Sequence, residues 1–295
     1  MIVAEWAYVL EGKVRITALD TEGGNFIGEV EKGDLWYFPA GHPHSLQGLS
    51  KGGCEFLLIF DDGNFSEDST FLLSDFMAHI PKSVLGKNFR VHPEIFKNIP
   101  AKEKYIFQGS IPGTMEEENP SGVQQSKHVF THKMLAQEPI KTEGGGRLRI
   151  TDSSNFPLSA TVAAAHVTIP PHGIREMHWH PNADEWSYFI RGRARVTVFA
   201  SSNSARTFDY QAGDVGIVPK SMGHYVENIG DEEVEMLEMF RAPRFEDFSL
   251  EQWLAATPKR NVAEHLFDGH EAAGKKFVDE LKLTKMPVKP KPSKL

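Results

Sequence analysis

Residues 178–185 read HWHPNADE, and they carry more information about this chain than any other segment. His178 and His180 lie in a run typical of a β-strand, so their imidazoles are expected on one face of a sheet. Glu185 follows His180 after four intervening residues, and His224 comes just after a turn and a loop that contain glycine. Three imidazoles and one carboxylate form a pocket for a divalent first-row metal. A six-coordinate ion there would keep two positions open for chemistry.

The same pattern occurs earlier in the chain. A shift of 180 residues without a gap aligns Glu5 with Glu185 and His44 with His224. This periodicity predicts a duplicated domain. The counterparts of the two strand histidines would fall before the first residue, so the first repeat is expected to keep one carboxylate and one imidazole. Those two groups alone make a poor metal site.

Several segments resemble known motifs of the cupin family. The first and second cupin motifs are similar to His178-x-His180-x4-Glu185-x6-Gly192 and to Gly33-x5-Pro39-x-Gly41-x2-His44. Segments 175–180, 210–215 and 223–228 resemble the oxalate decarboxylase branch of the bicupins, and segment 60–71 is similar to the active-site lid of that family. The resemblance implies an all-β fold of two cupin (double-stranded β-helix or jelly-roll) barrels. The first barrel is expected to lack its opening strands, and helices are expected between the barrels and at the C-terminus.

The resemblance also implies a function. Oxalate would be converted to formate and carbon dioxide, with Mn(2+) or Fe(2+) as the metal and dioxygen as co-catalyst. The expected metal ligands are His178, His180, Glu185 and His224 in the second barrel, and Glu5 and His44 in the first. Glu67, in the lid, would relay protons at the first metal. The alternatives are a non-catalytic metal-binding bicupin produced by truncation and an oxalate oxidase, against which Glu67 argues. Helices after a cupin barrel commonly pack on neighbouring subunits in this family, so a homo-oligomer is expected.

Two further side chains are candidates for catalysis. Glu238 lies in the strand-like run 234–240, where its repeat counterpart is Leu58. A carboxylate that faces a barrel interior is costly unless it is paired or protonated, and a protonated one could donate a proton. The resemblance also places the proton donor here. Arg175 precedes His178 by three residues, so strand parity puts it on the opposite face. The resemblance alone places it near the metal, where it would hold a substrate carboxylate, and a surface ion pair is the equal alternative.

Composition excludes several classes of protein. The formal net charge of −8 argues against a nucleic-acid partner, because phosphate binding needs concentrated positive charge. Cys54 is the only cysteine, so an intrachain disulfide and a thiolate metal cluster are both excluded. No apolar stretch has the length of a membrane-spanning helix. The sequence does not distinguish a cytoplasmic from a secreted protein, because any signal peptide would precede the present start.

Hydrophobic periodicity divides the chain into four expected parts: a first barrel over 1–75, a helical segment and linker over 76–125, a second barrel over 126–245, and C-terminal helices with a basic tail over 246–295. Strands are predicted over 8–18, 26–30, 35–38 and 55–60, and helical spacing over 71–80. Residues 112–125 are acidic and then polar, which predicts the linker. A capping box at 249–252, Pro258 and the pattern 271–281 predict three later helices.

Overall fold

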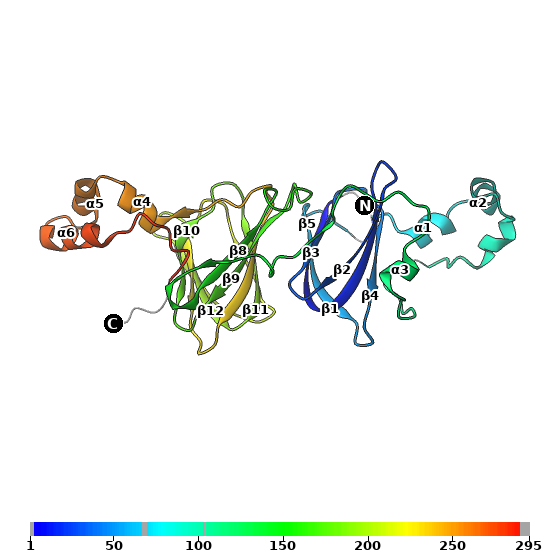
Figure 1. Cartoon of the computed structure of the whole chain (residues 1–295). Helices are drawn as coiled ribbons and strands as arrows, with labels where there is room; N and C mark the ends of the chain where they lie inside the picture. The colour runs from blue at the N-terminus through cyan, green and yellow to red at the C-terminus, as the bar shows by residue number, and fades with distance from the viewer. Residues whose placement is uncertain (1–2, 67–69, 103, 290–295) are drawn as a thin grey trace. The chain divides into compact units, whose positions relative to one another are not determined.

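The structure, a computed structural model of the chain, describes residues 3–66, 70–102 and 104–289. Two compact units divide at residues 132 and 133. Strands dominate both units and helices are few (Figure 1), which confirms the predicted all-β class. The four-part division of the chain stays a prediction.

The first unit is built around one long, bent strand, β1 (Glu5–Leu19). Its first half pairs with β3 and β5, and its second half pairs with β2 and β4. Gly12 lies at the bend with φ +79°, and a Cβ there would meet the carbonyl oxygen of Gly53 at 2.5 Å. Glycine is therefore required at this position. The other elements are β2 (Asn25–Glu31), β3 (Leu35–Phe38), β4 (His44–Gly48), β5 (Cys54–Phe60), α1 (Leu73–Ala78), α2 (Lys82–Phe89), the 3-10 helix η2 (Pro93–Asn98), α3 (Met115–Glu118) and β6 (Thr131–His132).

The second unit contains two six-stranded sheets. The first has the order β13-β12-β15-β10-β17, with β18 also paired to β10, and the second has the order β14-β11-β16-β9-β8-β7. The strands are β7 (Ile140–Lys141), β8 (Arg147–Thr151), β9 (Ala163–Ile169), β10 (Ile174–Trp179), β11 (Glu185–Arg191), β12 (Arg193–Phe199), β13 (Ala205–Gln211), β14 (Val215–Val218), β15 (His224–Asn228), β16 (Val234–Phe240), β17 (Phe248–Ser249) and β18 (Val288–Lys289). The remaining helical elements are η3 (Glu143–Gly145), α4 (Leu250–Ala256), α5 (Lys259–Leu266) and α6 (Glu271–Glu280).

The structure confirms the duplication. Strands β2, β3, β4 and β5 begin and end 180 residues before β13, β14, β15 and β16. The registers agree as well, because Glu5 pairs with Phe38 and Glu185 pairs with Val218 at the same offset. The units differ in what flanks these strands. Within the described part of the first unit, β4 and β5 pair with β1 alone, whereas β15 and β16 each have strand partners on two sides.

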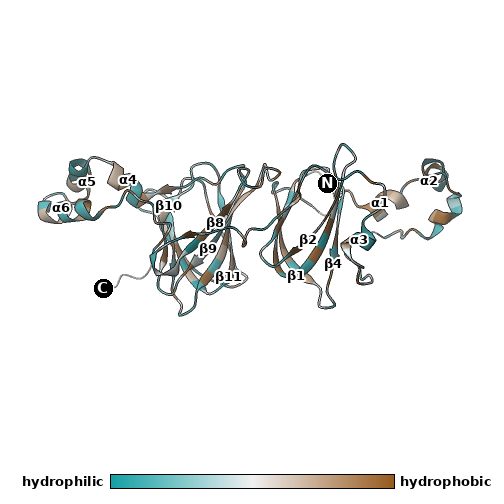
Figure 2. Cartoon of the chain, viewed as in Figure 1, coloured by the Kyte–Doolittle hydropathy of each residue, from teal (hydrophilic) through white to brown (hydrophobic). Residues whose placement is uncertain are grey.

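A continuous apolar core holds the second barrel together. Side chains from both sheets meet there, including Phe189, Val196, Val226 and Met236. Figure 2 shows many hydrophobic residues on the strands of this unit. The alternation of buried and less buried residues along β11 and β12 directs Phe189 and Val196 into this core.

The helical predictions are confirmed in position but not in every detail. The pattern 71–80 gives the shorter helix α1, which ends before Pro81. Ser249 caps α4 by accepting a hydrogen bond from the backbone of Gln252, whose side chain binds Leu283 instead of completing a capping box. The segment 112–125, predicted as the linker, contains the short helix α3 with a capping box at Thr114. The acidic run that suggested a linker supplies the carboxylate of that box.

Candidate metal centre

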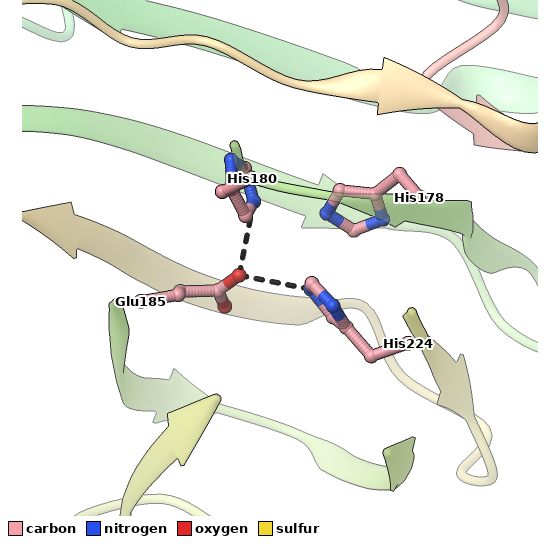
Figure 3. A group of neighbouring side chains, drawn as sticks. All are labelled: His178, His180, Glu185 and His224. Carbon is pink, nitrogen blue, oxygen red and sulfur yellow. Dashed lines mark hydrogen bonds and ion pairs between the residues drawn. The ribbon is translucent and has the colours of Figure 1, made fainter. Parts of the chain in front are cut away.

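Four side chains converge at one end of the second barrel. His178 lies on β10, His180 follows the end of that strand, Glu185 begins β11 and His224 begins β15. One ligand atom from each residue lies within 4.8 Å of the others, and all four residues are buried. Figure 3 shows the four side chains pointing toward one another. The structure thus brings together the four residues that the sequence spacing selected.

Each of the three histidines makes the same kind of contact through its Nδ1 atom. Each Nδ1 lies close to a backbone carbonyl oxygen. The distance is 2.6 Å from His178 to the oxygen of Glu176, 2.7 Å from His180 to that of Glu246, and 3.0 Å from His224 to that of Met222. A carbonyl oxygen only accepts, so each Nδ1 carries a proton and donates it. In the neutral ring, Nε2 then presents a lone pair. The backbone therefore fixes the tautomer that a metal ligand needs.

Glu185 supplies the negative charge of the group. Its Oε2 lies 2.9 Å from Nε2 of His224 and 3.1 Å from Nε2 of His180, while its Oε1 accepts a hydrogen bond of 2.6 Å from Ser187. Burial opposes ionisation, but the positive charge that His224 carries when its Nε2 is also protonated lowers the pKa of Glu185 well below its ordinary value. A bound metal ion would take the place of that proton. The carboxylate is therefore ionised and oriented before any ligand arrives.

This donor set fits a divalent ion. Nε2 of His178 is buried and has no hydrogen-bond partner among the described residues. Burial, and then the charge of Arg175, lower the pKa of His178 well below its ordinary value, which keeps the ring neutral as a ligand must be. Imidazole and carboxylate lone pairs that face one another repel unless a cation lies between them. Three nitrogens and one oxygen suit a first-row metal.

Arg175 lies beside this group, and the parity argument that placed it on the opposite face is wrong. Arg175 is opposite Val226 and His178 is opposite His224, so β10 has one more residue than β15 between these two pairs. Such a bulge shifts the alternation of faces by one residue. Arg175 is also fully buried, which excludes the surface ion pair.

Arg175 and Glu238 form an ion pair in which both side chains are inaccessible to solvent. Nε of Arg175 donates to Oε1 at 2.9 Å, and Nη2 donates to Oε2 at 3.4 Å. Burial raises the pKa of Glu238, the charge of Arg175 opposes this change, and the nearby charge of Glu185 raises the pKa further. Because its contact with Arg175 is longer, Oε2 is the atom on which a proton would reside.

Comparison with known proteins identifies the family. The cupin family pattern matches residues 3–97 and 132–270. Oxalate decarboxylase OxdC of Bacillus subtilis (strain 168) is 53% identical over 288 residues, which cover 97% of this chain and 72% of that protein. The chain belongs to the oxalate decarboxylase family of bicupins. This homology supports an oxalate decarboxylase-like, carboxy-lyase function.

Other relatives of this bicupin agree. A probable oxalate decarboxylase of Arthroderma benhamiae is 44% identical over 259 residues, which cover 87% of this chain and 64% of that protein. The structure of oxalate decarboxylase from Bacillus subtilis at pH 4.6 matches with a TM-score of 0.93 at 52% identity, and covers 99% of this chain and 75% of that chain. Oxalate oxidases resemble the bicupin only distantly.

In the first barrel of this bicupin, Glu5 and His44 occupy the positions of Glu185 and His224. Nε2 of His44 lies 3.6 Å from Oε2 of Glu5, and Nδ1 of His44 is 2.9 Å from a backbone carbonyl, as in His224. Oε1 of Glu5 accepts a hydrogen bond of 2.9 Å from Trp36. Within residues 3–66, 70–102 and 104–289, only the second barrel gathers three or more potential ligands. Glu5 and His44 as metal ligands remain a prediction.

Two charged residues near Arg175, Asp247 and Lys285, were not predicted from the sequence. Asp247 accepts a hydrogen bond of 3.0 Å from Nη2 of Arg175 and also pairs with Lys285. Neither residue lies in a motif, so no sequence signal marks them. Glu67, the expected proton relay of the lid, lies outside the described residues. No helix in the described part of the bicupin is long and apolar enough to span a membrane.

Proposed function

We propose that this bicupin converts oxalate to formate and carbon dioxide with a manganese ion held by His178, His180, Glu185 and His224. The observation that carries the proposal is the buried set of three Nε2 lone pairs and one carboxylate, next to the Arg175–Glu238 pair. Family membership supports it, because the Bacillus subtilis relative is an oxalate decarboxylase with Mn(II) centres. Iron(II) is the alternative ion for these ligands.

The side chains around the ion have separate roles in the proposed reaction. A bound ion would supply a Lewis acid and a one-electron redox centre, with dioxygen as co-catalyst. Arg175 uses four N–H groups on Glu238, Asp247 and Pro287, which leaves the second N–H of Nη1 for a substrate carboxylate. Glu238 takes the proton of the oxalate monoanion at Oε2 and returns it to the remaining carbon as the carbon–carbon bond breaks, so that carbon dioxide and formate leave and Glu238 is again a carboxylate paired with Arg175.

Replacement of Glu238 by glutamine tests the proposal. The parent protein, supplied with manganese under air, is expected to convert ¹³C-labelled oxalate to ¹³C-formate, which NMR detects directly. Glu238→Gln keeps the shape of the side chain but lowers its acidity, so formate production is expected to fall about 10²- to 10⁴-fold, the usual contribution of a general acid. The metal content should not change, because Glu238 is not a ligand.

Three outcomes of the same experiment separate the hypotheses. Hydrogen peroxide produced in place of formate would support the oxidase. A manganese-loaded parent that produces neither would support the non-catalytic bicupin. Equal formate production by the parent and Glu238→Gln would keep the reaction but remove Glu238 as the proton donor. Phe189→Leu, a change in the apolar core away from the charged groups, serves as the control for loss of activity through destabilisation.

We also propose that the chain forms a homo-oligomer. Large apolar side chains are exposed in segment 71–111 and in the C-terminal helical region; they include Phe71, Leu73, Phe76, Phe89, Ile95, Ile106, Phe107, Trp253 and Leu283. Exposed apolar surface of this kind is typical of protein interfaces. Light scattering is expected to give a mass of more than one chain, and the double substitution Ile106→Glu, Phe107→Glu should lower it. A parent that is monomeric at micromolar concentration would contradict the proposal.

A further inference from the structure

We propose that Asp247 is a positioning residue for Arg175, and that it acts together with a C-terminal strap formed by residues 285–289. The inference rests on the proposed function, because Arg175 is the residue assigned to the substrate carboxylate. Asp247 lies between β16 and β17, and the strap follows the last helix, α6.

The guanidinium of Arg175 is held by three different partners. Glu238 accepts from Nε and Nη2, Asp247 accepts from Nη2 at 3.0 Å, and the carbonyl oxygen of Pro287 accepts from Nη1 at 3.3 Å. Glu238 holds one edge of the planar group, but its second hydrogen bond, from Nη2 to Oε2, is long at 3.4 Å and fixes the plane only weakly. Acceptors on different edges of the plane fix both its direction and its tilt. Asp247 is therefore the second charged anchor of Arg175, and it shares the Nη2 group with Glu238.

The strap is hydrogen-bonded to β10, the strand that carries Arg175. β18 pairs antiparallel with β10, with Val288 opposite Arg175. The carbonyl oxygen of Pro287 also accepts a hydrogen bond of 3.0 Å from the backbone of Glu176, and Val288 is fully buried in the barrel core. Lys285 pairs with Asp247. The strap thus presents one carbonyl oxygen to Arg175 and one ammonium group to the carboxylate that anchors Arg175.

Burial makes these contacts effective. The side chain of Arg175 is fully buried and that of Asp247 is 4% exposed, so water cannot replace a lost partner without rearrangement. The hydrogen bonds from Arg175 to Glu238 and Asp247 join charged groups on both sides and are stronger than neutral ones. If Asp247 were absent, Glu238 would remain the single charged partner of Arg175. The guanidinium would then sample several orientations, and the N–H left for substrate would no longer be fixed.

Kinetics of Asp247→Asn test the positioning role. Removal of the charge at constant shape is expected to raise KM for oxalate about tenfold, with kcat changed less than threefold, because misplacement of a binding group by about 1 Å costs on this order or more. Asp247→Glu, which restores the carboxylate, should recover most of the loss. Asp231→Asn, at a fully exposed carboxylate of the same unit, is the matched control and should leave KM unchanged. A purely structural role would lower thermal stability and the active fraction but leave KM at the parent value.

A second measurement does not depend on turnover. In metal-free protein labelled with ¹⁵N-arginine, the Nε–H of Arg175 should give a slowly exchanging NMR signal, assigned through its absence in Arg175→Met; manganese is left out because its unpaired electrons would broaden this signal. The signal should broaden or disappear in Asp247→Asn and return in Asp247→Glu. If the parent fails to decompose oxalate, this signal still decides the positioning role. An unchanged signal together with an unchanged KM in Asp247→Asn would overturn the inference, even in a fully active enzyme.

Discussion

Arg175→Met is expected to destabilise the second unit by about 3–5 kcal/mol, the usual cost of removing one partner from a buried ion pair. The arginine neutralises Glu238 and Asp247, whose side chains are 0% and 4% exposed. Without it, Asp247 would keep its ion pair with Lys285, and Glu238 would lose its ion pair. Hydrogen exchange in β9 and β16 is expected to accelerate by about two to three and a half orders of magnitude, since a tenfold change corresponds to 1.4 kcal/mol. Manganese should be absent during this measurement, so that loss of metal does not contribute.

The double variant Arg175→Met, Glu238→Gln shows whether the unpaired charge causes the loss. It should be more stable than Arg175→Met alone, because one uncompensated carboxylate has been removed. Arg195→Met is the matched control, since Arg195 forms a similar pair with Asp209 on neighbouring strands, but at the surface. Its effect on hydrogen exchange should be small. An equal effect of Arg175→Met and Arg195→Met would contradict the assignment of the buried pair as a main determinant of stability.

The sequence predicted the convergence of His178, His180, Glu185 and His224 because their placement depends on local geometry. His178 and His180 share a strand face through a two-residue spacing, and Glu185 and His224 stand at the first positions of the next ligand-bearing strands. The duplication added an independent check. A gap-free shift of 180 residues predicts the same register in both units, and the structure shows Ala7 opposite Leu58 and Ser187 opposite Glu238.

The position of Arg175 could not be derived in this way. Strand parity assumes an unbroken alternation, and a single extra residue in β10 reverses it. Nothing in the residues 175–178 marks a bulge, because none of them is glycine. Resemblance to the family placed Arg175 correctly near the ligands because it carries tertiary information that a periodic pattern lacks.

Contacts between segments that are distant in the chain could not be predicted from the sequence either. Asp247 meets Arg175 from 72 positions away, and Lys285 meets Asp247 from 38 positions away. Both residues lie in segments that look like solvated loop and tail, where charge is ordinary. The strap becomes recognisable only when β18 is seen to pair with β10, since a two-residue strand has no periodicity of its own.

Loss of the metal is expected to have a large effect on activity and on the stability of the second unit. The parent is expected to bind about one tightly held divalent ion per chain, because the four-ligand group lies in the second barrel alone among the described residues. Glu185→Gln removes the only negative charge of the group at constant shape. Its metal affinity should fall about 100-fold or more, since changes to ligands cost at least as much as changes to the partners that orient them. Formate production should fall to background.

The stability of the second unit should follow the metal. An ion present at about 1,000 times its dissociation constant contributes about 4 kcal/mol, which corresponds to a shift of about 10 °C in the Tm of a unit of this size. Chelation of the parent should therefore lower the Tm of the second unit by about that amount, with no change in hydrogen exchange of β1 in the first unit. Elemental analysis and calorimetry measure the two quantities.

Glu5→Gln is the internal control for this prediction, because Glu5 occupies the position of Glu185 in the first repeat and lies 3.6 Å from the equivalent histidine. It makes the same chemical change at a place with one imidazole instead of three. Its metal content and the Tm of its second unit should equal those of the parent. Two ions per parent chain, one of which is lost in Glu5→Gln, would show that the first barrel completes its own site with groups beyond Glu5 and His44.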